Sequence, residues 1–357
     1  MLACVYSRKD KFLLTRRPRP SVVEDGDAVV RITLASICTS DLHIMHGSVP
    51  RAVPGIVVGH EAVGVVEEVG SAVRGVRPGD RVAIGVETFC GECFFCRRGS
   101  VNNCTLPDGG WALGCRIDGL QAGYARIPHA DTGLTRIPDG VDDKAALLTG
   151  DILATGMWAA DIADIEAGST VLVIGAGPTG CCAVACAALR SPRHIIVTDI
   201  DPARLRFVKK HFPGVTAVPP EELPATIAAL CPHGGADSVI EAAGTPETFR
   251  AAWQYARPAA TVAVIALYDE AQTLPLPDMY GKNLVFKTGG VDGNKCGEIL
   301  SLIADGKLDV SPLITHTFPL SRADEAYRLF AEKADGVMKV ALVPDDEIGA
   351  EEIAFSV

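Results

Sequence analysis

Hydrophobic and polar positions follow two different rhythms along the chain, and the rhythm changes near residue 150. Before that point, short runs rich in β-branched residues are separated by glycine and proline, which is typical of strands and turns. The predicted strands cover residues 28–34, 56–58, 62–69 and 81–86. This pattern predicts a β-rich first domain over residues 1–152.

From residue 153 to 296, apolar strand-like runs alternate with helix-like stretches. The predicted strands cover residues 170–174, 194–198, 237–240, 261–266 and 284–287, and the predicted helices cover residues 180–189, 202–211 and 246–255. Short buried strands that alternate with helices predict a parallel sheet covered on both faces. The chain is therefore an α/β protein with a doubly wound domain over residues 153–296.

The last part of the chain, residues 297–357, predicts helices at 297–304 and 323–333 and a strand at 337–343. An acidic tail, residues 345–352, follows the strand, and we expect it to be solvated.

Composition narrows the function classes. The 357 residues include 33 Lys and Arg against 44 Asp and Glu, a net charge of −11, which argues against nucleic-acid or anionic-membrane partners. Twelve cysteines in so long a chain suggest thiols or metal ligands, because disulfide scaffolds are small secreted domains.

Residues 167–189 contain no charge, but glycines interrupt them, so we expect no membrane span. The N-terminus has only a short apolar start before Arg8 and Lys9, so we expect no signal peptide. The predicted location is the cytoplasm.

A glycine fingerprint follows the first strand of the alternating region. Gly175 permits a tight turn, Gly177 lets the backbone approach a pyrophosphate, and Gly180 lets the helix pack closely on the strand. The free N–H groups of the helix start favour an anion, so Pro178 and Thr179 are predicted cofactor contacts as well. A structural turn in a domain without a nucleotide is the alternative.

Asp199 ends the next predicted strand, 19 residues after Gly180. An acid at this offset accepts hydrogen bonds from both ribose hydroxyls and repels a 2′-phosphate, which favours NAD over NADP. Arg204 lies close to Asp199 in sequence and is a further predicted cofactor contact. Its positive charge weakens the predicted preference for NAD over NADP.

Four cysteines, Cys90, Cys93, Cys96 and Cys104, lie within 15 residues. Four thiolates can surround one tetrahedral zinc and leave no open position, so the predicted role is structural. An iron–sulfur cluster and four unrelated thiols are the alternatives.

A looser set consists of Cys38, His60 and Asp151. A thiolate, an imidazole and a carboxylate give zinc three ligands and leave one position open for substrate. These residues are far apart in sequence, so their types alone prove little.

The order of the motifs resembles the zinc-dependent medium-chain alcohol dehydrogenases. The motifs are Cys-Thr-Ser-Asp-Leu-His (38–43), Gly-His-Glu-Ala-Val-Gly (59–64), Pro-Gly-Asp-Arg-Val (78–82), the four cysteines and the glycine fingerprint. Residues 150–156, with Gly110 and Trp111, resemble the branch in which aspartate is the third catalytic-zinc ligand, which includes bacterial secondary-alcohol dehydrogenases.

The resemblance implies a GroES-like catalytic domain and a Rossmann NAD-binding domain, with the active site in the cleft between them and residues 297–357 returning to the first domain. It further implies that zinc on Cys38, His60 and Asp151 activates an alcohol for hydride transfer to NAD, in a homodimer or homotetramer.

The same resemblance suggests roles for five other residues. Ser40 relays the substrate proton through the cofactor ribose to His43, and Glu61 acts beside the zinc ligands. Trp111 lines the substrate pocket, and Lys339 is a further candidate contact to the cofactor.

The best-known secondary-alcohol enzymes of that branch lack the four-cysteine lobe and carry an NADP-type signal, whereas this chain has the lobe and Asp199. A polyol, sugar-alcohol or hydroxysteroid dehydrogenase of the same fold is therefore an alternative. A second alternative, from a different functional class, is a non-catalytic nucleotide-binding redox sensor.

Overall fold

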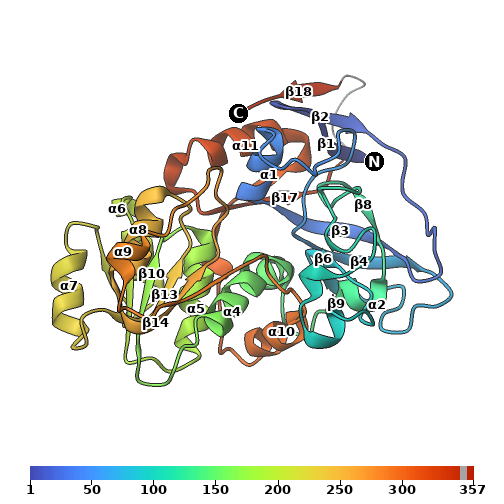
Figure 1. The fold of residues 1–357 in the computed structure, drawn as a ribbon. Coiled ribbons are helices and arrows are strands. Elements are labelled where there is room, and N and C mark those ends of the chain that lie inside the picture. The colour runs from blue at the N-terminus through green and yellow to red at the C-terminus, as the bar shows by residue number, and fades with distance from the viewer. Residues whose placement is uncertain (346–351) are drawn as a thin grey trace. The chain divides into compact units, whose positions relative to one another are not determined.

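The computed structural model describes residues 1–345 and 352–357 and divides into two compact units (Figure 1). The β-rich unit consists of residues 1–154 and 292–357, and the parallel-sheet unit consists of residues 155–291. The β-rich unit is thus formed by two separate segments of the chain, and the parallel-sheet unit lies between them in sequence.

Antiparallel strands form most of the β-rich unit. Its strands are β1 (Leu2–Arg8), β2 (Lys11–Arg16), β3 (Ala28–Ile37), β4 (Ala62–Val69), β5 (Arg81–Ile84), β6 (Glu87–Thr88), β7 (Gly110–Trp111), β8 (Tyr124–Ile127), β9 (Leu134–Arg136), β16 (Ile314–Pro319), β17 (Lys339–Val343) and β18 (Ile353–Phe355). Its helices are α1 (Thr39–Met45), α2 (Ala130–Gly133), α3 (Asp143–Ala146), α10 (Cys296–Ala304) and α11 (Ala323–Ala331).

The main sheet has the strand order β16-β17-β3-β4-β5-β9. The long strand β3 pairs with β17 and β4 in this order and also with β8. The β-branched residues of β3 and β4 bury one side of each strand in the core, which is the packing that such residues favour. The pairing of β17 with β3 joins the returning segment to the N-terminal part of the unit.

The strand predicted at residues 56–58 does not form. Only Val57 makes an isolated bridge, to Val5. Gly59 follows with φ = +91°, a left-handed conformation that ends an extended run and that glycine adopts without strain.

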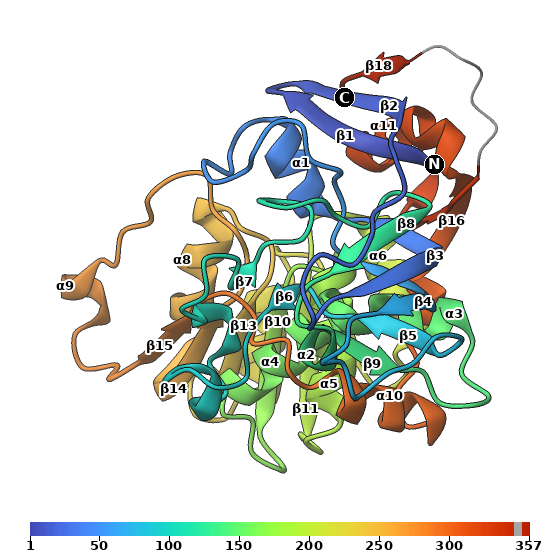
Figure 2. The ribbon, with the colours of Figure 1, turned by 90° about the vertical axis from the view of Figure 1, so that its right-hand side faces the viewer.

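The C-terminal strand β18 extends the β1–β2 hairpin to a three-stranded sheet, which the sequence did not predict (Figure 2). Helix α11 packs beneath this sheet through Tyr327, whose ring lies 5.4 Å from that of Phe12 and 5.6 Å from that of Phe355. Most of the predicted acidic tail, residues 346–351, lies outside the described residues.

The parallel-sheet unit confirms the doubly wound fold. Its strands are β10 (Thr170–Ile174), β11 (His194–Thr198), β12 (Thr216–Val218), β13 (Ala236–Glu241), β14 (Ala256–Val264) and β15 (Val285–Thr288), in the order β12-β11-β10-β13-β14-β15. Its helices are α4 (Ile152–Ile162, which begins in the β-rich unit), α5 (Pro178–Ala188), α6 (Pro202–His211), α7 (Leu223–Leu230), α8 (Pro246–Gln254) and α9 (Leu276–Met279).

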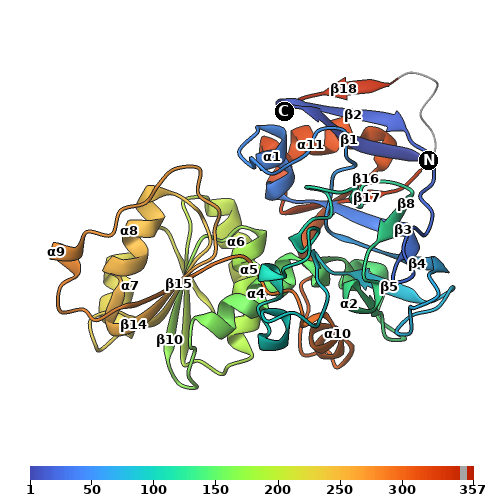
Figure 3. The same cartoon turned by 45° about the vertical axis from the view of Figure 1, so that its right-hand side comes forward.

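Both faces of this sheet are covered, with α4, α5 and α6 on one face and α7 and α8 on the other (Figure 3). The charge-free stretch at 167–189 forms β10, the glycine turn and α5. Among the described residues, no helix is long and apolar enough to cross a membrane.

Candidate functional site

The junction between β3 and α1 places Cys38 at the start of a helix. Cys38 is extended (φ −115°, ψ 156°) and caps α1, while the Asp41 carboxylate accepts the Cys38 N–H at 2.9 Å. This reciprocal cap fixes the turn from which the thiol projects. Asp41 was part of the motif at residues 38–43, but sequence reasoning gave it no role.

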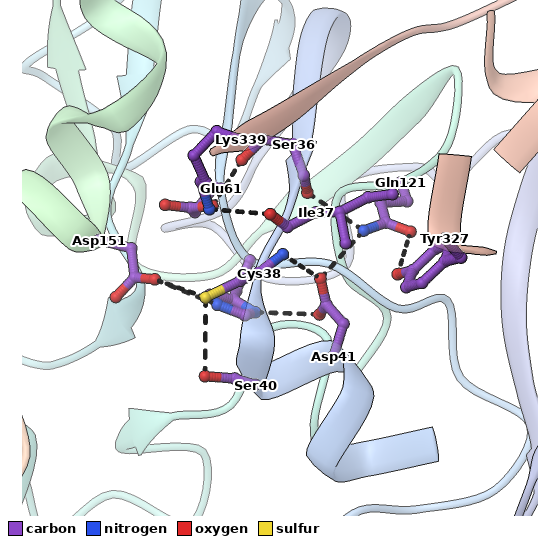
Figure 4. Close-up of polar contacts among 11 residues, drawn as sticks. Ser36, Ile37, Cys38, Ser40, Asp41, Glu61, Gln121, Asp151, Tyr327 and Lys339 are labelled. Atoms are coloured by element: carbon purple, nitrogen blue, oxygen red, sulfur yellow. Dashed lines mark hydrogen bonds and ion pairs between the residues drawn. The ribbon is translucent and has the colours of Figure 1, made fainter. Parts of the chain in front are cut away.

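Two residues from distant loops meet Cys38. His60 follows the left-handed Gly59, and Asp151 follows the short 3₁₀ turn Leu147–Gly150. Asp151 Oδ2 lies 3.7 Å from Cys38 Sγ and 3.2 Å from His60 Nε2 (Figure 4). All three side chains are buried, and one ligand atom from each lies within 4.8 Å of the others.

These separations suit a tetrahedral metal. Ligand bonds of about 2.0–2.3 Å separate tetrahedral ligand atoms by roughly 3.3–3.8 Å, close to the two distances above. His60 Nδ1 faces Asp41 Oδ1 at 3.4 Å, and neither atom has a hydrogen-bond partner among the described residues. A proton on Nδ1 would leave the Nε2 lone pair free for a metal.

The electrostatics of the cluster also favour a cation. Burial lowers the pKa of His60, but Asp41 and Asp151 outweigh it and raise that pKa well above its ordinary value. Burial raises the pKa of Asp151, but His60 opposes this and lowers it overall. The site therefore concentrates negative charge in a buried place, and a metal ion would compensate it.

A buried ion pair lies beside the cluster. Glu61 accepts hydrogen bonds from the Ser36 hydroxyl (2.5 Å) and from the Lys339 ammonium group, which also donates to the Ile37 carbonyl at 2.9 Å (Figure 4). Burial lowers the pKa of Lys339, but Glu61 and Cys38 raise it overall, so the lysine stays protonated. The predicted cofactor contact of Lys339 is not favoured by these contacts, because its ammonium group already holds Glu61.

The other predicted catalytic residues lie nearby. Ser40 Oγ is 3.7 Å from Cys38 Sγ, and His43 follows one turn later on α1. The Trp111 ring packs edge-on against the His60 ring, with 5.4 Å between centroids. The guanidinium of Arg51, which sequence reasoning missed, lies 5.2 Å from the Trp111 ring, a long-range contact without a sequence pattern.

The four cysteines of the lobe converge as a second cluster. Their sulfurs are separated by 4.0 Å (Cys90–Cys96), 3.5 Å (Cys93–Cys96) and 3.7 Å (Cys90–Cys104). Zinc–sulfur bonds of about 2.3 Å predict roughly 3.8 Å between ligands, so the geometry fits a tetrathiolate metal site. Backbone N–H groups lower the pKa of Cys93 to about 5, whereas burial raises that of Cys96 to about 12, so full ionisation requires a cation.

Among the described residues, the remaining cysteines belong to no cluster of potential metal ligands. Burial raises the pKa of Cys181, Cys186 and Cys296 to about 12, which makes these thiols poor nucleophiles.

The glycine fingerprint forms the predicted turn in the parallel-sheet unit. Gly175 has φ = +105°, and a Cβ at Gly180 would lie 2.0 Å from the Gly175 carbonyl. A Cβ at Gly177 would meet only Arg204, at 3.5 Å, so its backbone stays approachable. Pro178 and Thr179 are the first residues of α5.

Asp199 lies directly beside this turn. Its carboxylate accepts the N–H of Ala176 at 2.7 Å and that of Asp201 at 2.8 Å. Arg204 Nη1 lies 3.8 Å from Asp199. The residues predicted to bind the nucleotide are thus gathered at one end of β10 and β11.

Comparison with known proteins decides the family. Residues 24–139 match the alcohol dehydrogenase GroES-like domain, and residues 178–304 match the zinc-binding dehydrogenase domain. An alcohol dehydrogenase of Cupriavidus necator is 34% identical over 96% of this chain and 99% of its own length. The chain belongs to the zinc-dependent medium-chain alcohol dehydrogenase family.

Two further relatives agree. Alcohol dehydrogenase TADH from Thermus sp. ATN1 superposes with a TM-score of 0.88 at 32% identity, covering 97% of this chain and 100% of that one. The NADP-dependent isopropanol dehydrogenase of Thermoanaerobacter brockii is 30% identical over 89% of this chain and 92% of its own length. This dehydrogenase is therefore a zinc-dependent oxidoreductase for an alcohol and ketone pair, with a nicotinamide cofactor.

The buried Glu61–Lys339 pair generates a stability prediction for this dehydrogenase. Lys339→Met would leave the Glu61 carboxylate buried without its cation, which costs about 3–5 kcal/mol of the free energy of unfolding. Urea denaturation measures this loss. Adding Glu61→Gln should recover most of it, because the uncompensated charge is then gone.

The matched control is Arg322→Ala, which breaks the solvent-exposed pair of Arg322 with Glu325 and should leave the urea midpoint almost unchanged. Equal shifts in Lys339→Met and Arg322→Ala would contradict a special role for the buried pair.

Proposed function

We propose that Cys38, His60 and Asp151 hold the catalytic zinc, and that the enzyme interconverts secondary alcohols and ketones with NAD(H). The observation that supports this most strongly is the convergence of three buried ligand atoms from three distant segments. Three protein ligands leave a tetrahedral ion one position for substrate, as in catalytic zinc sites.

Zinc held there would supply Lewis-acid polarisation of the substrate oxygen, and a nicotinamide cofactor would supply the acceptor for the hydride of the substrate carbon. The protein supplies the path for the proton. Ser40, beside Cys38 Sγ, would take up the proton of the substrate hydroxyl while it releases its own hydroxyl proton towards His43, one turn further along α1, and His43 would exchange that proton with water.

Neighbouring residues shape this site. Glu61 holds negative charge beside the ligands, and Lys339 limits its movement through their ion pair. Trp111 packs against the His60 ring, so we assign it to the wall of the substrate pocket. Cys90, Cys93, Cys96 and Cys104 hold a structural zinc, since four thiolates leave no position for substrate.

Zinc content and activity test this assignment together. The wild-type chain should hold one zinc ion at each site and oxidise a simple secondary alcohol, such as 2-butanol, with the appearance of NADH absorbance. Cys38→Ser should lose one zinc and all turnover, because it removes a ligand of the catalytic ion. Cys93→Ser should lose the other zinc.

Cys115→Ala is the control, because Cys115 is a buried cysteine outside both clusters, and it should keep both ions. A Cys38→Ser variant that retains both zinc ions and full turnover would refute the ligand assignment. Faster turnover of sorbitol than of 2-butanol would favour the polyol alternative.

The preference for NAD over NADP rests on Asp199. Its carboxylate lies beside the fingerprint turn, where it would repel a 2′-phosphate. The NADP-dependent relative from Thermoanaerobacter brockii shows that NADP is used by a member of the family, so the preference needs a direct test.

Asp199→Asn keeps the shape of the side chain and an oxygen for the Ala176 N–H, but it removes the charge. The ratio of kcat/KM with NAD to that with NADP should fall by about tenfold or more, given the strength of hydrogen bonds to charged groups. Asp201→Asn is the control, since Asp201 caps α6 through Ala203. An unchanged ratio in Asp199→Asn would refute the cofactor assignment.

We also propose that two copies pair through β15, the edge strand of the parallel sheet. Exposed apolar side chains gather on and before this strand, namely Leu276, Tyr280 and Val285. An unpaired edge strand with apolar neighbours can pair with a strand of another chain. In a two-fold dimer, β15 of one copy would pair with β15 of the other.

Light scattering after size-exclusion chromatography tests this pairing. The wild-type chain should elute at twice the chain mass or a multiple of it, and Val285→Lys should shift it towards the monomer. Arg250→Glu, on the separate helix α8, should not. A wild-type monomer would contradict the proposal.

A further inference from the structure

A chain of buried hydrogen bonds leads from helix α11 to the metal-binding residues (Figure 4). The Tyr327 hydroxyl donates to Gln121 Oε1 at 2.8 Å, and Gln121 Nε2 donates to Asp41 Oδ2 at 3.2 Å. The same Asp41 oxygen accepts the Cys38 N–H. Tyr327, Gln121 and Asp41 are all fully buried, so water does not compete for these contacts.

The Asp41 carboxyl group fixes the direction of every bond in this chain. Its Oδ2 already accepts the Cys38 N–H, so Gln121 turns its NH₂ group towards this acceptor. Its second N–H then reaches the Ser36 carbonyl at 3.1 Å. Its oxygen faces Tyr327, which must donate. A flipped amide would place oxygen against two acceptors and NH₂ against a donor.

Gln121 is also locked to the loop that carries His60. Its N–H donates to the Val58 carbonyl at 2.9 Å, and its carbonyl accepts the Cys4 N–H at 3.0 Å. A Cβ at Gly59 would lie 2.5 Å from Gln121 Cγ, so the Gln121 side chain fills the space directly beside the residue before His60. The amide cannot move without disturbing that loop.

Asp41 transmits this constraint to the ligands. Oδ2 is held by Gln121 and by the Cys38 N–H, which leaves Oδ1 pointing at His60 Nδ1 across 3.4 Å. The rotation of the carboxylate thus sets the orientation of the imidazole, and through the backbone contact it also steadies Cys38. Partners of this kind orient ligands and tune their affinity for metal.

The hydroxyl of Tyr327 is not needed for packing. Its ring stacks against Phe12 and Phe355, which a phenylalanine would also do. Within the described part of the chain, the hydroxyl makes one hydrogen bond, the one to Gln121.

We propose that Gln121 and Tyr327 are positioning residues, which act through Asp41 on His60 and Cys38 and determine how firmly the catalytic zinc is held. This inference rests on the metal site of the proposed function. It links helix α11, in the returning segment, to the chemistry at the start of α1.

Tyr327→Phe tests the proposal with the smallest change. Zinc should leave the catalytic site roughly three- to tenfold faster when a chelator is added, in proportion to the loss of one buried hydrogen bond. Release from the four-cysteine site should stay the same and provides an internal reference. Turnover should fall in kcat, with the KM for NAD unchanged.

The matched control is Tyr6→Phe. Tyr6 belongs to the same hydrophobic core and packs on Phe12 with 6.0 Å between centroids, but its hydroxyl is outside the chain to Asp41. This variant should release both zinc ions at the wild-type rates. Equal acceleration in Tyr6→Phe and Tyr327→Phe would mean general loosening of the core and would overturn the proposal.

A double-mutant cycle identifies the route. In an Asp41→Asn background, Tyr327→Phe should add little to the rate of zinc release, because the link it acts through is already broken. Gln121→Met serves as a second background with the same expectation. Fully additive effects in both backgrounds would overturn the proposal.

The wild-type protein separates this inference from the proposed function. If it holds zinc only at the four cysteines, the catalytic site and this inference both fail. If it holds both ions, and Tyr327→Phe releases them at wild-type rates, only the positioning role fails.

Discussion

Three carboxyl side chains and a thiol, buried close together in the β-rich unit, constrain the rest of the site. They are Cys38, Asp41, Glu61 and Asp151. Removing charge from water is costly, so each must gain a compensating partner inside the protein. Lys339 compensates Glu61, hydrogen bonds from Gln121 and the Cys38 N–H compensate Asp41, and the proposed metal ion would compensate Cys38 and Asp151. This arrangement of charges supports the proposed cation site.

The returning segment of the chain supplies much of this compensation. Lys339 begins β17, which pairs with β3, and Tyr327 lies on α11 beneath the sheet that contains β18. The start of this segment is also bonded to the β-rich unit, because Asp292 accepts the N–H of Asn102 in the four-cysteine lobe at 3.0 Å. Residues 292–357 thus complete the site that residues 38–60 begin.

Local patterns allowed much of the fold and site to be predicted from the sequence. The glycine turn, the four-cysteine cluster and the alternation of strands and helices depend on neighbouring residues and formed as expected, although β12 and α7 were not among the predicted elements. Strand 56–58 failed because the left-handed Gly59 turns the chain towards His60. The contacts of Lys339 with Glu61 and of Tyr327 with Gln121 join residues 278 and 206 positions apart, and no local pattern encodes such pairings.

X-ray absorption at the zinc edge of the wild-type enzyme tests the central claim most directly. The two proposed sites would share five sulfur ligands between two zinc ions, and a nitrogen of His60 and an oxygen of Asp151 would be the other protein ligands of the second site. The spectrum should therefore show a mixed shell of sulfur and lighter atoms. A shell of sulfur alone would mean that only the four-cysteine lobe binds zinc and would contradict the account.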